Sequence, residues 1–436
     1  MSPRRSAVLP TLDRNGRVII AAKGARAFAF GLNSVGLGLF LAEVGLTGQS
    51  VAFILAAAMA GNAAFTLVIA LWGDRLGRRR VLVAGSLLML LAVAIPAAGA
   101  QPILLALVAF TGMVSVTANE STGLVSVDQS ILPQAVPERE RTKAFAMYGL
   151  VAFVASAFGS ASLGPLVALA DALGLGGVDR FGPTFVAYAA VGLVSAALVT
   201  QLDERAELGE PLQRGFAIRR SRGTVARLSA LFALDSFASG FAVQSFVAFW
   251  FASRHAVEPA TIGLLFFAGS LLAAASFPVA AALAGRIGLI RTMVFTHIPA
   301  NLFLIAMAFV PVGAAPLAAV FYLIRSLLST MDVPARQSYV MAVVDPAERT
   351  ATAGVTSLAR SVSQAAGPLV GGALLVPLGI GVPLIAAGAL KATYDVLLFF
   401  AFRGRPAPGE QDGRGAGERN GRGAPEREVR PPVDAA

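Results

Sequence analysis

The chain has 436 residues, of which 56% are hydrophobic and only 14% are Asp, Glu, Lys or Arg, and its formal net charge is +10. Soluble domains carry about 25% charged residues, so this composition argues against a soluble protein and indicates a chain embedded in lipid. The sequence has no cysteine and two histidines, which excludes a disulfide framework, thiol chemistry and a histidine-built metal site.

The first 17 residues are basic and polar, and we interpret them as a retained cytoplasmic tail rather than a cleaved signal peptide. Twelve apolar stretches follow, each long enough to cross a bilayer. They run over 18–43, 50–72, 79–99, 102–134, 142–170, 183–201, 227–251, 260–285, 290–312, 315–337, 349–377 and 381–403. Backbone groups in lipid must be satisfied internally, so each stretch is expected to be helical.

Arginine and lysine gather in alternate connections between these stretches, which places both termini in the cytoplasm of a cell-membrane protein. The connection 202–226 is the most charged internal one and divides the chain into bundles at 18–201 and 227–403. Residues 404–436 are rich in Gly, Pro, Arg and Glu and are expected to form a disordered cytoplasmic tail. Basic and aromatic residues are not interleaved, which argues against a nucleic-acid partner.

The two halves repeat each other weakly. "QSILPQAVPERERT" from Gln129 aligns with "QSYVMAVVDPAERT" from Gln337 at an offset of 208. "GDRLGRRR" aligns with "AGRIGLIR" at an offset of 211, which places Gly288 opposite Gly77. Repeats of six helices are typical of transporters that bind substrate between the halves, near the bilayer midplane.

The connection after the second stretch carries a specific motif. "ALWGDRLGRR" resembles the loop signature G-x-x-x-D-[RK]-x-G-[RK]-[RK] of the major facilitator superfamily, with Ala70 in place of the first glycine. "AGPLVGG" at 366–372 resembles a second motif of the superfamily, although drug antiporters carry that motif on helix 5 and here it lies on helix 11. The chain is therefore similar to the superfamily over 18–403.

This resemblance implies an all-α membrane fold of twelve helices in two pseudo-symmetric six-helix bundles. It also implies a gate in which the acidic residue of the motif docks at the N-terminus of helix 11 when the cytoplasmic side is shut. The alternative is that the motif only enforces topology. The gating residues are Asp74, Arg75, Gly77, Arg78 and Arg79.

Ionisable residues inside a span are functional candidates by default, because they are costly in lipid. The resemblance implies a cavity lined by helices 1, 4, 7 and 10, which favours three charged residues. Glu120 is a proton- or substrate-coupling residue or a structural hydrogen bond, and Asp235 is a second protonation site or a paired residue. Arg325 holds Glu120, binds an anionic substrate or only packs, and Asn33 and Gln244 are further polar contacts.

Four other charged residues are expected to form structural ion pairs. Asp332 and Arg360 lie at similar depths on helices 10 and 11. Lys391 and Asp395 are four residues apart and can pair on one face of helix 12. His297 is interpreted as a buried residue with no role in transport.

These features predict a monomeric, proton-coupled secondary transporter that exports small organic or drug-like molecules or sugars by alternating access. Transport of an organic anion through intramembrane arginines is the first alternative, and a membrane protein that does not transport is the second. No phosphate-binding G-x-x-x-x-G-K-[ST] loop is present, so ATP-driven pumping is excluded. No enzymatic activity, cofactor or metal is expected.

Overall fold

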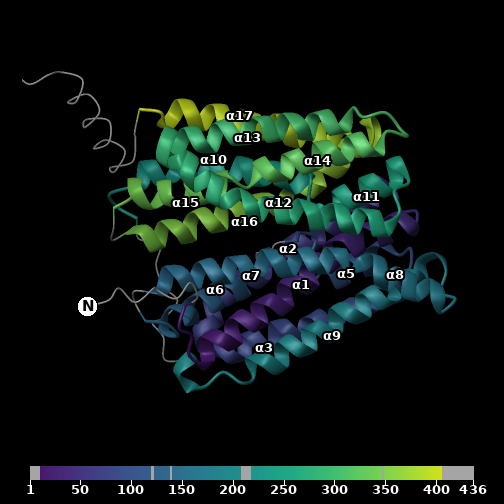
Figure 1. The fold of residues 1–436 in the computed structure, drawn as a ribbon, viewed down its shortest axis with the longest axis horizontal. Coiled ribbons are helices and arrows are strands. Elements are labelled where there is room, and N and C mark those ends of the chain that lie inside the picture. The colour runs from purple at the N-terminus through teal and green to yellow at the C-terminus, as the bar shows by residue number, and fades with distance from the viewer. Residues whose placement is uncertain (1–9, 119–121, 138–139, 208–217, 346–347, 405–436) are drawn as a thin grey trace, which may run out of the picture.

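The computed structural model describes residues 10–118, 122–137, 140–207, 218–345 and 348–404. All regular elements in this part of the chain are helices (Figure 1). The N-terminal half contains α1 (Arg14–Glu43), α2 (Gly48–Leu76), α3 (Arg78–Leu88), α4 (Ala94–Ala98), α5 (Pro102–Ala109), α6 (Gly123–Ile131), α7 (Arg141–Ala161), α8 (Leu163–Ala172) and α9 (Gly182–Val199). The C-terminal half contains α10 (Arg222–Phe241), α11 (Gln244–His255), α12 (Pro259–Ile287), α13 (Leu289–Ala308), α14 (Ala315–Ser329), α15 (Asp332–Val343), α16 (Arg349–Leu378) and α17 (Val382–Phe402).

Ten helical segments within the described residues are long and apolar enough to cross a membrane. The two predicted spans that do not appear among these ten are 102–134, which contains α5 and α6, and 349–377, which lies within α16. Large apolar side chains face outward, including Ile103 at 70% exposure and Phe309 at 67%. Such exposure is unfavourable in water, so this surface indicates a protein solvated by lipid.

Local sequence sets the helix ends in both halves. The side chain of Asp13 accepts a hydrogen bond from the backbone N–H of Gly16 and caps α1. Gly77 separates α2 from α3 with φ of 87°, and Gly288 separates α12 from α13 with φ of 90°. Only glycine adopts such positive φ values readily. The predicted equivalence of these two glycines is therefore confirmed in the backbone.

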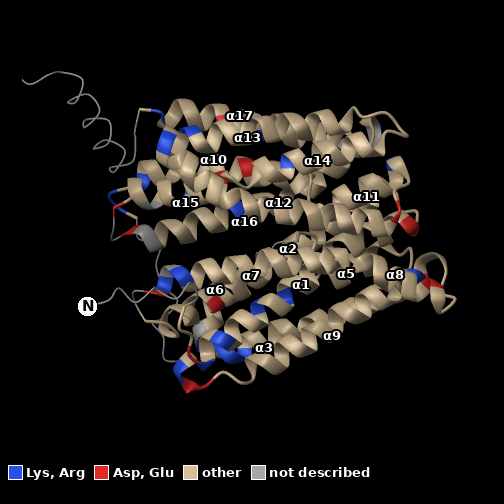
Figure 2. Cartoon of the chain, viewed as in Figure 1, with Lys and Arg blue, Asp and Glu red and all other residues tan. Residues whose placement is uncertain are grey.

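The two halves lie side by side as separate groups of helices (Figure 1). Lys and Arg gather at the end of the molecule where the N-terminus lies, which we call the terminal end (Figure 2). The described chain also finishes at this end, with α17. The opposite end, called the distal end here, carries the connection between α8 and α9 and the C-terminus of α11.

Glycines bring the two halves into close contact towards the distal end. A methyl group added at Gly38 of α1 would lie 2.1 Å from the carbonyl oxygen of Ser245 in α11. One added at Gly372 of α16 would lie 2.3 Å from the Cβ of Ala52 in α2. One added at Gly263 of α12 would lie 2.6 Å from the carbonyl oxygen of a serine in α7. Backbones can approach this closely only where side chains are absent, so these glycines form a seam between the halves.

The predicted boundaries of the tails and of the central connection stay predictions, because residues 1–9, 208–217 and 405–436 lie outside the described part of the chain.

Candidate functional site

Several predicted spans are divided into more than one helix, including the third, into α3 and α4, and the fifth, into α7 and α8. Three further divisions fall in spans that were expected to line a central cavity. The fourth span is divided into α5 and α6, so the prediction of one helix over 102–134 is wrong. The seventh span is divided into α10 and α11, and the tenth into α14 and α15. These are three of the four spans expected to line a central cavity. Interrupted helices at membrane depth are tolerated where they are covered by protein or line a cavity, and they often form transporter binding sites.

Other helices satisfy the backbone groups exposed by the break in the fourth span. The hydrogen bonds run from Asn33 Nδ2 to the Ser115 carbonyl at 2.8 Å, from Ser156 Oγ to the Ala118 carbonyl at 2.9 Å, and from the Ser245 N–H to the Val116 carbonyl at 3.1 Å. The last of these crosses from the C-terminal half to the N-terminal half. The predicted contact residue Asn33 thus supports the break itself. Glu120, the leading candidate from the sequence, lies outside the described residues.

An ion pair is buried in the N-terminal half between the first and fourth spans. Arg26 of α1 donates to Asp128 of α6, and both side chains are fully buried. The hydroxyl of Tyr148 in α7 also donates to Asp128, at 2.8 Å. The ammonium of Lys23 lies over the ring of Tyr148, 5.1 Å from its centroid. A carboxylate in this region is therefore held by a guanidinium and a phenol.

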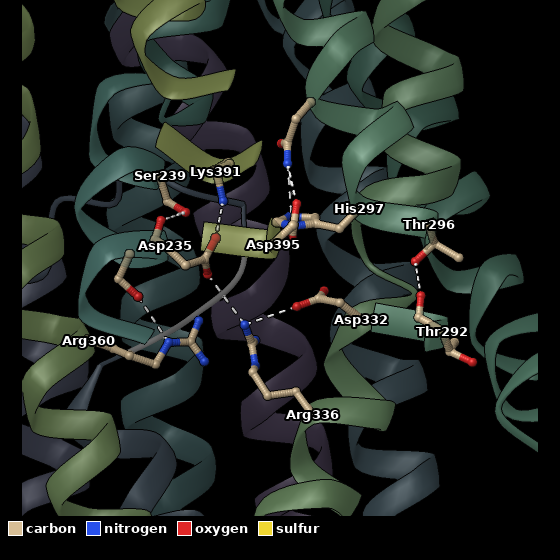
Figure 3. Close-up of polar contacts among 12 residues, drawn as sticks. Asp235, Ser239, Thr292, Thr296, His297, Asp332, Arg336, Arg360, Lys391 and Asp395 are labelled. Atoms are coloured by element: carbon tan, nitrogen blue, oxygen red, sulfur yellow. Dashed lines mark hydrogen bonds and ion pairs between the residues drawn. The ribbon is translucent and has the colours of Figure 1, made fainter. Parts of the chain in front are cut away.

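The C-terminal half contains a larger buried cluster around Asp235 of α10 (Figure 3). Its Oδ1 accepts from Lys391 Nζ of α17 at 2.6 Å, and its Oδ2 lies 3.4 Å from Arg336 of α15. The same Arg336 nitrogen lies 3.0 Å from Asp332, one turn earlier in α15. Nearby, Arg360 Nε of α16 donates to the Ser236 hydroxyl at 3.0 Å. When the pair of Asp395 and His297 is included, three acids and four bases contribute to this region.

The two buried pairs occupy equivalent positions in the repeat. The offset of 208 places Asp128 opposite Arg336, and it places Arg26 one residue before the position opposite Asp235. The base lies on the first span and the acid on the fourth in the N-terminal half. In the C-terminal half the acid lies on the seventh span and the base on the tenth. The charges are thus reversed while the helices they join correspond.

The structure corrects the predicted ion pairs of the C-terminal half. Asp332 pairs with Arg336 rather than with Arg360. Lys391 pairs with Asp235 rather than with Asp395 on its own helix. The two differences have different causes. Asp332 pairs with a base one turn along its own helix, whereas tertiary packing places Asp235 of another helix beside Lys391.

Asp395 instead faces α13. His297 Nδ1 lies 2.9 and 3.1 Å from its two carboxylate oxygens, and Asn301 Nδ2 donates to it at 3.0 Å (Figure 3). The interpretation of His297 as buried is confirmed, since it is 4% exposed.

Three predicted cavity residues have polar atoms that no hydrogen bond satisfies within the described part of the chain. They are Arg325, through its buried Nε, Gln244, through its Nε2, and Asn33, through its Oδ1. Arg325 lies in α14 beside Tyr322, and the described residues give it no carboxylate partner. A guanidinium without an acid suits an anionic group of a ligand.

The gating motif is placed at the terminal end. Arg75 is exposed near the end of α2, and Gly77 makes the turn into α3. The backbone N–H groups of Arg78 and Arg79 donate to the carboxylate of Glu207 at 2.8 and 3.0 Å. Glu207 therefore occupies the positive N-terminus of α3. The backbone of Asp74 lies in α2, and its side chain lies outside what the structure describes, so its docking stays a prediction.

A second carboxylate ties the start of the C-terminal half to the connection before α16. Glu348 accepts from the backbone N–H groups of Arg219, Arg220 and Ser221 at 2.6, 2.8 and 2.9 Å. These bonds, the one from Arg219 first, lower the pKa of Glu348 from its usual 4.5 to about 2. In the N-terminal half Glu140 accepts from the N–H of Thr11 at 2.6 Å. Both carboxylates and both donors are related by the offset of 208.

Sequence reasoning missed Arg26, Asp128 and Arg336. The signal for all three was present, because each is an ionisable residue within a predicted span, and that criterion had selected Asp235. The alignment of the halves also places Asp128 opposite Arg336. Applying both criteria together would have found the two pairs.

Comparison with known proteins places this geometry in context. A family model described as Major Facilitator Superfamily matches residues 20–365 and 238–433. An uncharacterized membrane protein of Saccharomyces cerevisiae, YJR124C, is 24% identical over 93% of this chain and 97% of its own length.

Solved structures share the fold. A bacterial homologue of the human lysosomal transporter Spinster, in an inward-facing and occupied conformation, aligns with a TM-score of 0.67 and 18% identity, covering 92% of this chain and 98% of the other. A D-xylose-proton symporter aligns with a TM-score of 0.66 and 12% identity, covering 88% and 97%. With twelve predicted spans, repeated halves, the loop motif and the matching family model, the chain belongs to the Major Facilitator Superfamily of transporters.

Proposed function

We propose that this transporter is proton-coupled and works by alternating access, with export of small organic or drug-like molecules or sugars as its activity. The observation that carries the proposal is the matched pair of buried carboxylate–guanidinium contacts, Arg26–Asp128 and Asp235–Arg336. Protonation of either carboxylate removes its charge and weakens its hold on the arginine. Proton binding therefore changes the contact between two spans in each half, which is the coupling that a proton-driven transporter needs.

The glycine seam supports alternating access. Close approaches at Gly38, Gly263 and Gly372 hold the halves together towards the distal end. Rocking about a central site separates this end as the terminal end closes. The similar Spinster homologue was solved facing inward, and if both termini are cytoplasmic the present arrangement corresponds to that state. The basic residues at the terminal end favour that orientation in a cell membrane.

Two predicted residues enter this proposal from the sequence alone. Glu120 is assigned to proton or substrate coupling, beside the break in the fourth span. Asp74 is assigned to the closed terminal end, so that Asp74→Asn slows turnover and leaves substrate binding in place. We also propose that the transporter acts as a monomer.

Transport of an organic anion is the second candidate function. The observation in its favour is Arg325, whose guanidinium has no carboxylate partner in the described residues. In this case Arg325 holds the negative group of the substrate, and Arg325→Ala abolishes uptake of anions while leaving that of other compounds.

The test uses purified protein in liposomes with an imposed pH gradient. Ethidium, D-xylose and p-aminohippurate serve as probes for cationic, neutral and anionic cargo. We expect the gradient to drive one class, and Asp128→Asn, Asp235→Asn and Glu120→Gln each to abolish the gradient-driven part. The control is Asp171→Asn, whose pair with Arg180 is partly exposed at the distal end. Gradient-driven flux that survives in all three variants would overturn proton coupling through these groups.

A further inference from the structure

In the cluster around Asp235, the ammonium of Lys391 relies on the Asp235 carboxylate as its acceptor. Lys391 is 6% exposed, and its ammonium donates to Asp235 at 2.6 Å. When Asp235 takes up a proton, Lys391 loses its charged acceptor. A buried ammonium without a counter-charge is strongly unfavourable. Arg336 does not share this difficulty, because it already lies 3.0 Å from Asp332. Lys391 therefore needs a second acceptor within its reach.

Asp395 meets that requirement. It lies four residues after Lys391 in α17, so the two side chains project from the same face of one helix. Asp395 is 1% exposed, and Lys391 and Asp235 both lie within electrostatic range of its carboxylate. Its oxygens accept from His297 and Asn301 of α13, which is three contacts of 3.1 Å or less. A carboxylate has about four lone-pair sites, so one further donor can be accommodated.

We propose that Asp395 is the alternate acceptor for Lys391. In this structure Lys391 is bound to Asp235, and protonation of Asp235 transfers the ammonium one helical turn along α17 to Asp395. His297 and Asn301 are positioning residues that keep the Asp395 carboxylate oriented until Lys391 arrives. The transfer carries the effect of a proton on α10 to the pair of helices α13 and α17, at the outside of the bundle. This inference rests on the proposed proton coupling.

The charged groups around the two acceptors are consistent with the transfer. Asp235 is faced by Lys391 of α17, Arg336 of α15, Arg360 of α16 and His297 of α13. Asp332 and the phenol of Tyr394 lie near the same arginines.

A cycle of variants tests the proposal without any substrate. Asp235→Asn mimics the protonated acid, so in that background Asp395 is expected to hold Lys391. Asp395→Asn should then lower the melting temperature of the full chain in nanodiscs by more than it does in the wild type. We expect the excess to be about 1–2 °C, because the shift in melting temperature for a given loss of stability becomes smaller as the chain becomes longer. Asp235→Asn with Asp395→Glu keeps the carboxylate and is expected to match Asp235→Asn alone.

Removal of the lysine provides the decisive comparison. If the double variant at Asp235 and Asp395 does not fold, adding Lys391→Gln is expected to restore folding, because no buried ammonium then needs an acceptor. Additive effects of the two substitutions, or no restoration by Lys391→Gln, would overturn the transfer.

A second readout follows the coupling itself. In liposomes Asp395→Asn is expected to move the pH of half-maximal gradient-driven flux down by about one unit, since protonating Asp235 becomes harder. An unchanged profile in a folded variant would also overturn the proposal. If wild-type protein shows no proton-driven flux, the proposed function fails, while the melting cycle still decides where Lys391 binds.

Discussion

Each half buries an ion pair between two equivalent spans, but the acid and the base exchange places between the halves. In the N-terminal half the arginine lies on the first span and the aspartate on the fourth; in the C-terminal half the aspartate lies on the seventh span and the arginine on the tenth. The aspartate of the first half also accepts from a tyrosine hydroxyl, whereas that of the second half accepts from a lysine. The repeat thus preserves which helices the ion pair joins, but it does not preserve which of the two helices carries the positive charge.

The surroundings of the pairs differ in a way that matters for proton binding. In the C-terminal half, Arg336 contacts a second carboxylate, and the cation Lys391 has Asp395 one turn away. When Asp235 is neutral, Arg336 therefore keeps a carboxylate partner in Asp332, and Lys391 has Asp395 within one turn. The Arg26–Asp128 pair is fully buried and in direct hydrogen-bond contact, whereas Arg336 and Asp235 are 7% and 5% exposed and lie 3.4 Å apart. We therefore expect the N-terminal pair to be the more sensitive of the two.

The largest expected effect comes from breaking that pair. Asp128→Asn takes a charged partner from the buried Arg26 guanidinium, and losing one member of a buried pair typically costs about 3–5 kcal/mol. Asp235→Asn is expected to cost less, because Asp332 and Asp395 remain. Unfolding in nanodiscs measures both, and Arg26→Gln added to Asp128→Asn should recover part of the loss. Equal losses in the two halves would remove the proposed asymmetry.

A smaller effect is expected at the seam. Gly38→Ala places a methyl group 2.1 Å from the Ser245 carbonyl, and overpacking of this kind costs about 1–3 kcal/mol. The cost falls only on the state in which the distal end is closed, so the population shifts towards opening there. The chain has no cysteine, so Ala248→Cys in the seam, fully buried, serves as the reporter.

We expect a maleimide to label this cysteine faster in the Gly38→Ala background. The matched control is Gly149→Ala, where an added methyl group meets nothing within 4 Å. Labelling at the same rate in both backgrounds would argue against a seam that opens.

The smallest effect concerns the anchor at Glu348 and is pH-dependent. The pKa of this group is lowered to about 2 in the folded chain from an ordinary 4.5. Its contribution is therefore complete above about pH 4.5 and is lost as the pH falls towards 2. Hydrogen exchange at the amides of Arg219, Arg220 and Ser221 should quicken over that range, after correction for intrinsic rates.

Glu348→Gln is expected to give fast exchange at these amides at every pH, while Glu204→Gln, at an exposed position, should leave it unchanged. Protection that is independent of pH in the wild type would show that the carboxylate does not hold this segment.

Much of this architecture follows from the sequence. The apolar stretches locate the spans, since lipid requires long apolar helices. The repeat offsets identify equivalent positions, which the turns at Gly77 and Gly288 and the anchors at Glu140 and Glu348 confirm. Both kinds of inference depend on the order of residues along the chain, which does not require knowledge of how the helices pack.

The partners of buried charges could not be predicted in the same way. Lys391 has an acid four residues away on its own helix and another on α10, and only the packing of α10 against α17 decides in favour of Asp235. The break in the fourth span was hidden for a related reason. Its carbonyl groups are satisfied by Asn33, Ser156 and Ser245, which are distant in sequence and come together only in the folded molecule.

The most direct test of the central claim measures both ends of the molecule at once. Spin labels at Arg80 and Arg286 span the terminal end, and labels at Leu173 and Val312 span the distal end; all four positions are exposed. Double electron–electron resonance in nanodiscs then reports each distance as the pH is lowered. We expect the two distances to change in opposite directions, and Asp128→Asn with Asp235→Asn to remove that dependence on pH. Distances that stay constant, or that change in the same direction at both ends, would contradict proton-controlled alternating access.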